Sequence, residues 1–144
     1  DQRVLVEAAS AAKKITPTLR KRDYAMAFQH AMDAMTRYRK VWGEEHPDTA
    51  MAYRNLAIVF LARGNSEAAQ QTFEQALAIQ RKVLAPRHPL TAMTHARLGL
   101  LLAERGEQAR ARPELEQALA VLADVLAPDH TLLLSIRKSL NVPD

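Results

Sequence analysis

The sequence repeats itself with a period of 42 residues. Residues 46–87 align without a gap with residues 88–129, and 18 of the 42 aligned positions are identical. Each copy begins with His-Pro, and a third copy begins at His130 and is cut short. A period of this length is the signature of a repeat architecture, in which one unit cannot bury its apolar face alone and neighbouring units stack.

Each copy contains two blocks of apolar residues at helical spacing, separated by a glycine. In the first copy Leu56 and Phe60 lie in one block, Phe73 and Leu77 lie in the next, and Gly64 falls between the blocks. A glycine here can adopt the left-handed conformation that ends a helix and turns the chain. One unit is therefore a helix, a tight turn and a second helix. The pattern predicts helices near residues 48–63, 66–84, 90–105 and 107–126.

Prolines affect two of the predicted helices. Pro113 removes a hydrogen bond to Ala109, so we expect a kink or a late helix start there. Near the N-terminus, the helical pattern of residues 3–15 is interrupted by Thr16-Pro17, because proline disfavours continuation of a helix. Thr16 could also cap a new helix that has Pro17 at its first position.

The two ends of the chain carry incomplete units. Residues 23–42 repeat the second-helix pattern, so residues 1–45 are interpreted as a degenerate first unit. Residues 131–140 are predicted to form a single helix that shields the open end, or that begins another unit if the natural chain continues. The predicted fold is all-α: a right-handed α-solenoid of stacked antiparallel helix pairs. It has about three units plus a C-terminal helix, in a single domain over residues 1–144.

The residues shared by the copies form a recognisable motif. Its segments are Asn55-Leu56-Ala57, Gly64, Glu67-Ala68, Ala76-Leu77-Ala78-Ile79 and His88-Pro89-Leu90-Thr91-Ala92. They resemble the tetratricopeptide repeat in its 42-residue kinesin light chain form, strongly over 46–129, partially over 130–140 and weakly over 1–45. The resemblance implies a solenoid fold and a non-catalytic scaffold that binds a peptide or protein segment in its concave groove.

The residue types that catalytic and metal sites need do not occur in suitable patterns. The chain has no cysteine, which excludes a thiol nucleophile and cysteine metal sites. His46, His88 and His130 recur in units about 10 Å apart, whereas zinc holds its ligands at about 2 Å. They therefore cannot share an ion, and we expect them to serve the turn between repeats. With no catalytic serine motif and no glycine-rich phosphate loop, we expect no enzyme activity, no metal and no cofactor.

The net charge of +4 is concentrated in the N-terminal third. Residues 1–42 contain nine Lys and Arg against four Asp and Glu, whereas residues 43–144 contain eleven against twelve. The basic third is either a solvated face or a docking surface for an acidic partner. An alternative is nucleic-acid binding, although few aromatic residues are interleaved with the cations. The cations concerned are Arg20, Lys21, Arg22, Arg37, Arg39 and Lys40.

Neither a membrane span nor a secretory signal is visible in the sequence. No apolar run approaches the roughly 18–20 residues of a transmembrane helix, and this favours a cytoplasmic location. The chain starts with Asp1 rather than Met, so it could be trimmed from something longer. A second hypothesis is therefore a sensory or regulatory repeat module of a larger bacterial signalling enzyme or regulator.

The first helices of stacked pairs line the concave face, so the candidate site lies on these helices. Positions one helical face away from the core residues Leu56 and Phe60 should point into the groove. The candidates are Met51, Arg54, Asn55 and Ile58 in the first copy, and Met93, Arg97 and Leu100 in the second. The apolar members suit pockets for the side chains of a bound segment.

The resemblance assigns roles to two equivalent positions, Asn55 and Arg97. In tetratricopeptide domains of this kind, asparagine hydrogen-bonds the peptide backbone and arginine holds a ligand carboxylate, in keeping with their donors and acceptors. The carboxylate-gripping subfamily also has a lysine four residues before its arginine, where this chain has Met93. Lys13 is the equivalent position in the first unit. We expect a peptide partner with acidic residues rather than a nucleic acid.

Three consecutive leucines, Leu132 to Leu134, lie in the last predicted helix. A helix packed on one side buries only part of such a set, whereas the terminal units of a solenoid need polar outer faces. We therefore expect weak self-association through the C-terminal helix.

Overall fold

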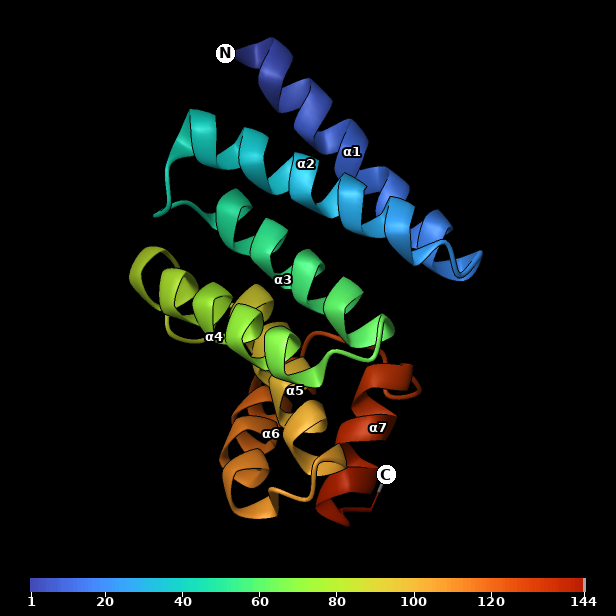
Figure 1. Ribbon diagram of the computed structural model, residues 1–144. Helices are drawn as coiled ribbons and strands as arrows, with labels where there is room; N and C mark the ends of the chain where they lie inside the picture. Colours follow the sequence, from blue (N-terminus) through green and yellow to red (C-terminus); the bar gives the residue numbers. More distant parts are fainter. Residues whose placement is uncertain (144) are drawn as a thin grey trace. The chain divides into compact units, whose positions relative to one another are not determined.

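The computed structural model describes residues 1–143, and these residues form seven α-helices and no β-strand (Figure 1). The helices are α1 (Gln2–Arg20), α2 (Tyr24–Trp42), α3 (Pro47–Ala62), α4 (Ser66–Val83), α5 (Pro89–Glu104), α6 (Gln108–Leu122) and α7 (Thr131–Leu140). The all-α prediction is confirmed, and most predicted helix boundaries are correct to within one or two residues.

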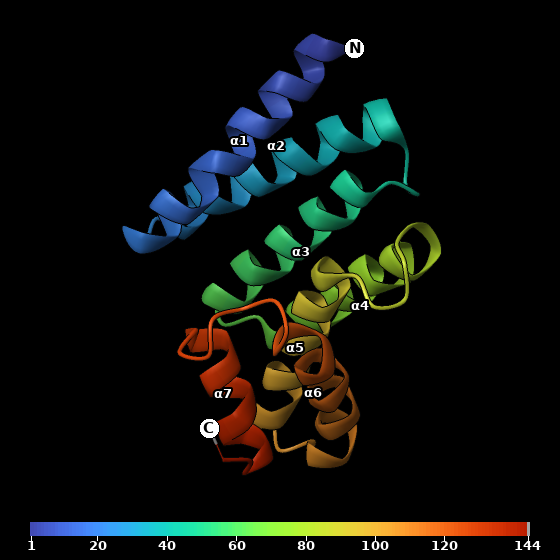
Figure 2. The same ribbon diagram turned by 180° about the vertical axis from the view of Figure 1, so that it is seen from behind.

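The helices gather into two compact units. The first unit contains α1 to α4 and ends at Val83, and the second begins at Leu84 and contains α5 to α7. In the first unit, α1 pairs with α2 and α3 pairs with α4, while α3 also packs against α2 (Figures 1 and 2). In the second unit α5 pairs with α6, and α7 packs against both.

The core of the first unit is built from small and medium side chains. Ala27, Ala31, Ala50 and Ala76 are almost completely buried, and small residues let neighbouring helix backbones approach closely. Larger side chains fill the remaining space between the helices, among them Ile15, Met35, Leu56 and Val59. The alternation of small and large apolar residues therefore holds the pairs together and leaves polar positions for the surface.

The repeated histidines begin the first helices of the repeats. The Nδ1 atoms of His46, His88 and His130 accept hydrogen bonds from the backbone N–H two residues further on, at 3.0, 3.1 and 3.1 Å. In α3 and α5 a proline follows the histidine at the first helical position, where its missing N–H costs nothing. The expectation that these histidines serve the turn between repeats agrees with this geometry.

The proline expectations for α1 and α6 were partly wrong. Helix α1 runs from Gln2 to Arg20 without stopping at Pro17. Pro17 cannot donate to the carbonyl of Lys13, so the helix continues with that one bond missing, and the Thr18 hydroxyl beside it donates to the carbonyls of Lys14 and Ile15 at 2.8 and 2.7 Å. Helix α6 likewise runs through Pro113, although it does end earlier than predicted.

Candidate functional site

The predicted site residues of α3 form one half-exposed row. Met51, Asn55 and Ile58 are partly exposed, whereas Ala52 and Leu56 beside them are buried. Spacings of four and three residues place the members of the row on one face of the helix. Arg54 lies next to the row and is also partly exposed, but it lines neither of the depressions described below.

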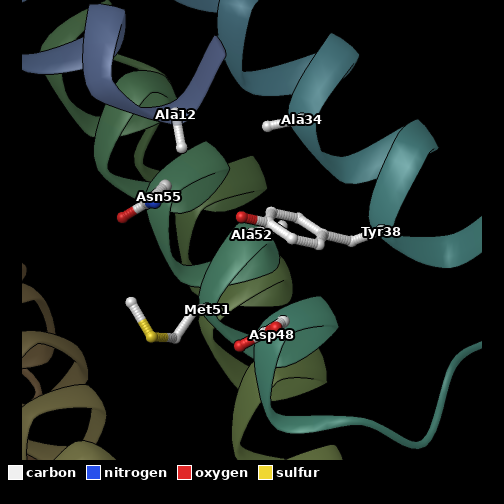
Figure 3. Close-up of a pocket in the computed structure, with 7 residues that line it drawn as sticks. All are labelled: Ala12, Ala34, Tyr38, Asp48, Met51, Ala52 and Asn55. Atoms are coloured by element: carbon white, nitrogen blue, oxygen red, sulfur yellow. The ribbon is translucent and has the colours of Figure 1, made fainter. Parts of the chain in front are cut away.

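A small cavity lies where α3 faces α1 and α2. Its volume is about 60 Å³, and it is lined by Ala12, Ala34, Tyr38, Asp48, Met51, Ala52 and Asn55. Figure 3 shows Tyr38 reaching from α2 across to α3, with Asn55 and Ala12 facing each other from α3 and α1. Burial, followed by the negative charge of Asp48, raises the pKa of Tyr38. The tyrosine therefore keeps its proton and contributes a neutral hydroxyl to this cavity.

A second depression continues along the same face of the first unit. It measures about 70 Å³ and is lined by Ala12, Ile15, Thr16, Leu19, Asn55 and Ile58. Asn55 and Ala12 border both depressions. Pockets for whole small molecules are typically about 300–1,000 Å³, so each depression has room for a side chain only. The Asn55 amide stands between the two.

The equivalent row on α5 belongs to the second unit. Met93, Arg97 and Leu100 are partly exposed, and they stand 42 residues after Met51, Asn55 and Ile58. The Nε of Arg97 is buried and has no hydrogen-bond partner in the described part of the chain. Burial lowers the pKa of Arg97. The described residues therefore supply no acceptor for this nitrogen.

A larger groove of about 510 Å³ lies between α5 and α7 in the second unit. It is lined by Leu100, Ala103, Glu104, Gln108, Ser135, Lys138 and Ser139. Of these, only Leu100 is among the candidates identified from the sequence. The repeat period could have identified two more of the groove residues, because Ser135 and Ser139 follow Met93 and Arg97 by 42 residues. The groove combines an apolar wall with one acidic and one basic side chain.

The predicted site residues are thus divided between the two units. Met51, Asn55 and Ile58 come together in the first unit, and Leu100 lines the groove of the second. Met93 and Arg97 share the half-exposed face of Leu100 without lining that groove. Among residues 1–143 no three His, Cys, Asp or Glu side chains gather closely enough to hold a metal ion. No helix in this range is long and apolar enough to cross a membrane.

The solved structures that resemble this chain include the following three. Two are crystal structures of a putative kinesin light chain from Podosopora anserina with nearly identical tetratricopeptide-like repeats. They are 24% and 25% identical, with TM-scores of 0.79 and 0.69; each match covers 92% of this chain and 62% or 63% of the other. The third is BtubC (BKLC) from P. vanneervenii, at 20% identity and a TM-score of 0.73, with 85% of this chain and 50% of the other covered.

These likenesses establish the fold of a kinesin light chain-like repeat protein. The chain spans between half and just under two thirds of the length of the proteins it matches. No curated protein matches the chain. A family model described as "Tetratricopeptide repeat" matches residues 18–82 and residues 67–124. Because these matches together span well over half of the sequence, the chain belongs to the tetratricopeptide repeat family.

Proposed function

We propose that this chain is a non-catalytic scaffold that binds peptide or protein segments, through the half-exposed face of α3 in the first unit and, as a separate site, through that of α5 in the second. Tetratricopeptide repeats are commonly interaction scaffolds. The observation that carries the proposal is the repeated row at positions 51, 55 and 58 and positions 93, 97 and 100, which stays partly exposed while its neighbours are buried.

In the first unit, Asn55 is the residue proposed to hold the peptide backbone. A side-chain amide offers a donor and an acceptor together, which matches a peptide group. Met51 and Ile58 flank it, and the two depressions beside Asn55 have room for side chains of an extended segment. The binding mode is therefore backbone recognition at one amide with a shallow apolar anchor on either side.

In the second unit, Arg97 is the residue proposed to recognise an acidic side chain or a terminal carboxylate. Its buried Nε has no partner in the described residues, and a planar guanidinium can donate two parallel hydrogen bonds to a carboxylate. A carboxylate would also offset the burial that disfavours the charge of Arg97. Leu100 offers apolar contact one turn further along α5.

The test begins with selection of binding peptides from a displayed library on the 144-residue chain, followed by calorimetry with single variants. Arg97→Ala should weaken binding of an acidic peptide by about 1.5–3 kcal/mol, because a shielded charge-assisted bond is lost. Arg97→Lys should recover only part of this, since an ammonium lacks the planar fork. Asn55→Ala should weaken binding of peptides irrespective of their charge.

The matched control is Gln75→Ala, which removes an exposed polar side chain from α4. This variant should bind the selected peptides like the wild type. Unchanged affinity for both Asn55→Ala and Arg97→Ala, with folded protein by circular dichroism, would place the binding site elsewhere and leave only the fold standing.

A further inference from the structure

The turn between α1 and α2 has the same backbone as the two glycine turns of the later repeats. In each, one N–H bonds a carbonyl three residues back, and the next N–H bonds one five residues back. The residues in the left-handed conformation are Gly64 (φ 81°), Gly106 (φ 80°) and, 42 residues before Gly64, Arg22 (φ 59°). The first turn therefore has an arginine where the others have glycine.

Packing does not explain this arginine. A Cβ added at Gly64 or Gly106 would meet no atom within 4 Å, so these turns point into open space. Arg22 is exposed, and its side chain forms no hydrogen bond or ion pair with any described residue. Residues other than glycine are disfavoured in the left-handed region. Arg22 therefore lowers the stability of the fold, and its side chain forms no hydrogen bond or ion pair that would offset this cost.

The neighbours of Arg22 are cations as well. Residues 13–22 contain five Lys and Arg and no Asp or Glu. Arg63 begins the turn between α3 and α4, which lies at the same edge of the first unit as the turn between α1 and α2 (Figures 1 and 2). We call Arg20, Lys21, Arg22 and Arg63 the basic turn edge; all four are exposed. The acid beside it, Asp23, is occupied in capping α2 through the N–H of Met26.

Other cations of the N-terminal third are already neutralised within the unit. Arg37 pairs with Glu7 and Asp33, and Arg39 pairs with Glu44. No such partner faces the side chains of Arg20, Lys21 or Arg22 in the described residues. Lys13, Lys14 and Lys40 are also exposed without an ion pair in the described residues, but they stand apart from the turn, whereas Arg20, Lys21 and Arg22 are consecutive in it.

We propose that the basic turn edge is a docking surface for an acidic segment of a partner protein, separate from the half-exposed rows on α3 and α5. Guanidinium groups bind carboxylates through paired hydrogen bonds, and clustered cations attract an anionic chain. A protein segment is favoured over single-stranded nucleic acid because only one partly exposed ring, Tyr24, adjoins the Arg20–Arg22 cations in sequence, whereas single strands stack successive bases on several aromatic side chains. Phe28, one turn further along α2, packs against Phe60 and is covered by the Arg63 guanidinium 5.0 Å away.

The test uses Arg22→Gly, which gives the first turn the residue of the other two. The melting temperature should rise by about 2–5 °C as the left-handed strain is relieved. At low salt, affinity for a fluorescein-labelled decaglutamate peptide should fall about twofold to fivefold, the effect of losing one exposed charge pair. Arg20→Gln/Lys21→Gln/Arg22→Gly should lose more than tenfold, and salt should weaken wild-type binding by screening.

The control is Arg81→Gln, which removes one exposed positive charge from α4 in the same unit. It should bind decaglutamate like the wild type. Equal weakening by Arg81→Gln, or wild-type affinity of Arg22→Gly, would overturn the proposal. So would a labelled 20-base-pair DNA duplex that binds more tightly than decaglutamate and loses affinity in the triple variant, because the edge would then recognise phosphates. None of these outcomes bears on the variants of Asn55 and Arg97 in the half-exposed rows of α3 and α5.

Discussion

His95 on α5 and Glu114 on α6 form a hydrogen-bonded pair across the helix pair of the second unit. His95 is 2% exposed, so its ring depends on this partner inside the core. In the preceding repeat the same two positions hold Tyr53 and Thr72, and Tyr53 bonds instead to Glu44 in the loop before α3. The two repeats therefore use different polar contacts at equivalent places in the same helix-pair framework.

Glu114→Ala should reduce the free energy of unfolding by about 1–3 kcal/mol, because it leaves a buried histidine nitrogen without a partner. Urea denaturation followed by far-ultraviolet circular dichroism measures this. Glu116→Ala is the matched control, since Glu116 pairs with Arg112 one turn away on an exposed face. The control should cost no more than about 0.5 kcal/mol. Equal effects of the two variants would mean that the His95 contact contributes nothing.

Gly99 on α5 is needed for the close approach of α6. A Cβ at this position would lie 2.7 Å from the Cγ and Cδ2 of Leu115, which is completely buried, and 3.2 Å from the Cβ of Glu114. Helix propensity alone favours Gly99→Ala by about 1 kcal/mol, but overpacking typically costs about 1–3 kcal/mol. We expect a net loss of stability in chemical denaturation. A more stable Gly99→Ala variant would show that Leu115 can move aside cheaply.

Much of the fold could be predicted because the repeat marks its own boundaries. The histidine caps at His46, His88 and His130, together with Gly64 and Gly106, indicated where helices begin and turn, and the structure has them there. Those signals are local in sequence, so each acts on backbone within a few residues of itself. The continuation of α1 through Pro17 was missed because the prediction took proline as a helix stop, whereas the helix tolerates the loss of one bond, to the carbonyl of the exposed Lys13.

The site was less predictable because it depends on which side chains meet. The 42-residue period placed Met51, Asn55 and Ile58 on one face of α3, and all three are partly exposed in the structure. The period alone could not indicate that Tyr38 reaches into the same cavity, or that Arg97 has a buried Nε without a partner. The 42-residue period does align Arg22 with Gly64, so the sequence indicated an arginine at the position of a turn glycine. Only the backbone angle shows that Arg22 adopts the left-handed conformation.

Stability should fall at alkaline pH because of Tyr53. Burial, then the hydrogen bond to Glu44 and the charge of that carboxylate, raise the pKa of Tyr53. A folded-state pKa above the unfolded value of about 10 favours the protonated phenol, so its contribution is complete below about pH 10 and is lost as pH rises through the folded-state pKa. Unfolding followed by the fluorescence of Trp42 between pH 8 and 11 should show this decline.

Tyr53→Phe should reduce the steepness of that decline, since the group that loses its proton is gone. Tyr38, whose pKa is also raised, should account for part of the remaining slope. A pH dependence identical in the wild type and Tyr53→Phe would contradict the assignment.

The C-terminal helix α7 leaves one of its three consecutive leucines at the surface. Leu133 is completely buried and Leu132 is 8% exposed, whereas Leu134 is 37% exposed. An exposed leucine on a terminal helix can bury apolar surface against a second copy of the chain. We expect weak, concentration-dependent association in analytical ultracentrifugation, and Leu134→Glu should reduce it because burying an unpaired carboxylate is costly. Leu133→Glu should instead unfold the second unit.

Thr131→Glu provides the control for charge, because Thr131 is exposed at the first position of the same helix. Adding a carboxylate there should leave association unchanged if the Leu134 side chain is the contact. Equal dissociation by Thr131→Glu would indicate general charge repulsion between copies. A strictly monomeric wild type at millimolar concentration would rule out association through α7 altogether, and the exposed Leu134 would then be an ordinary surface residue.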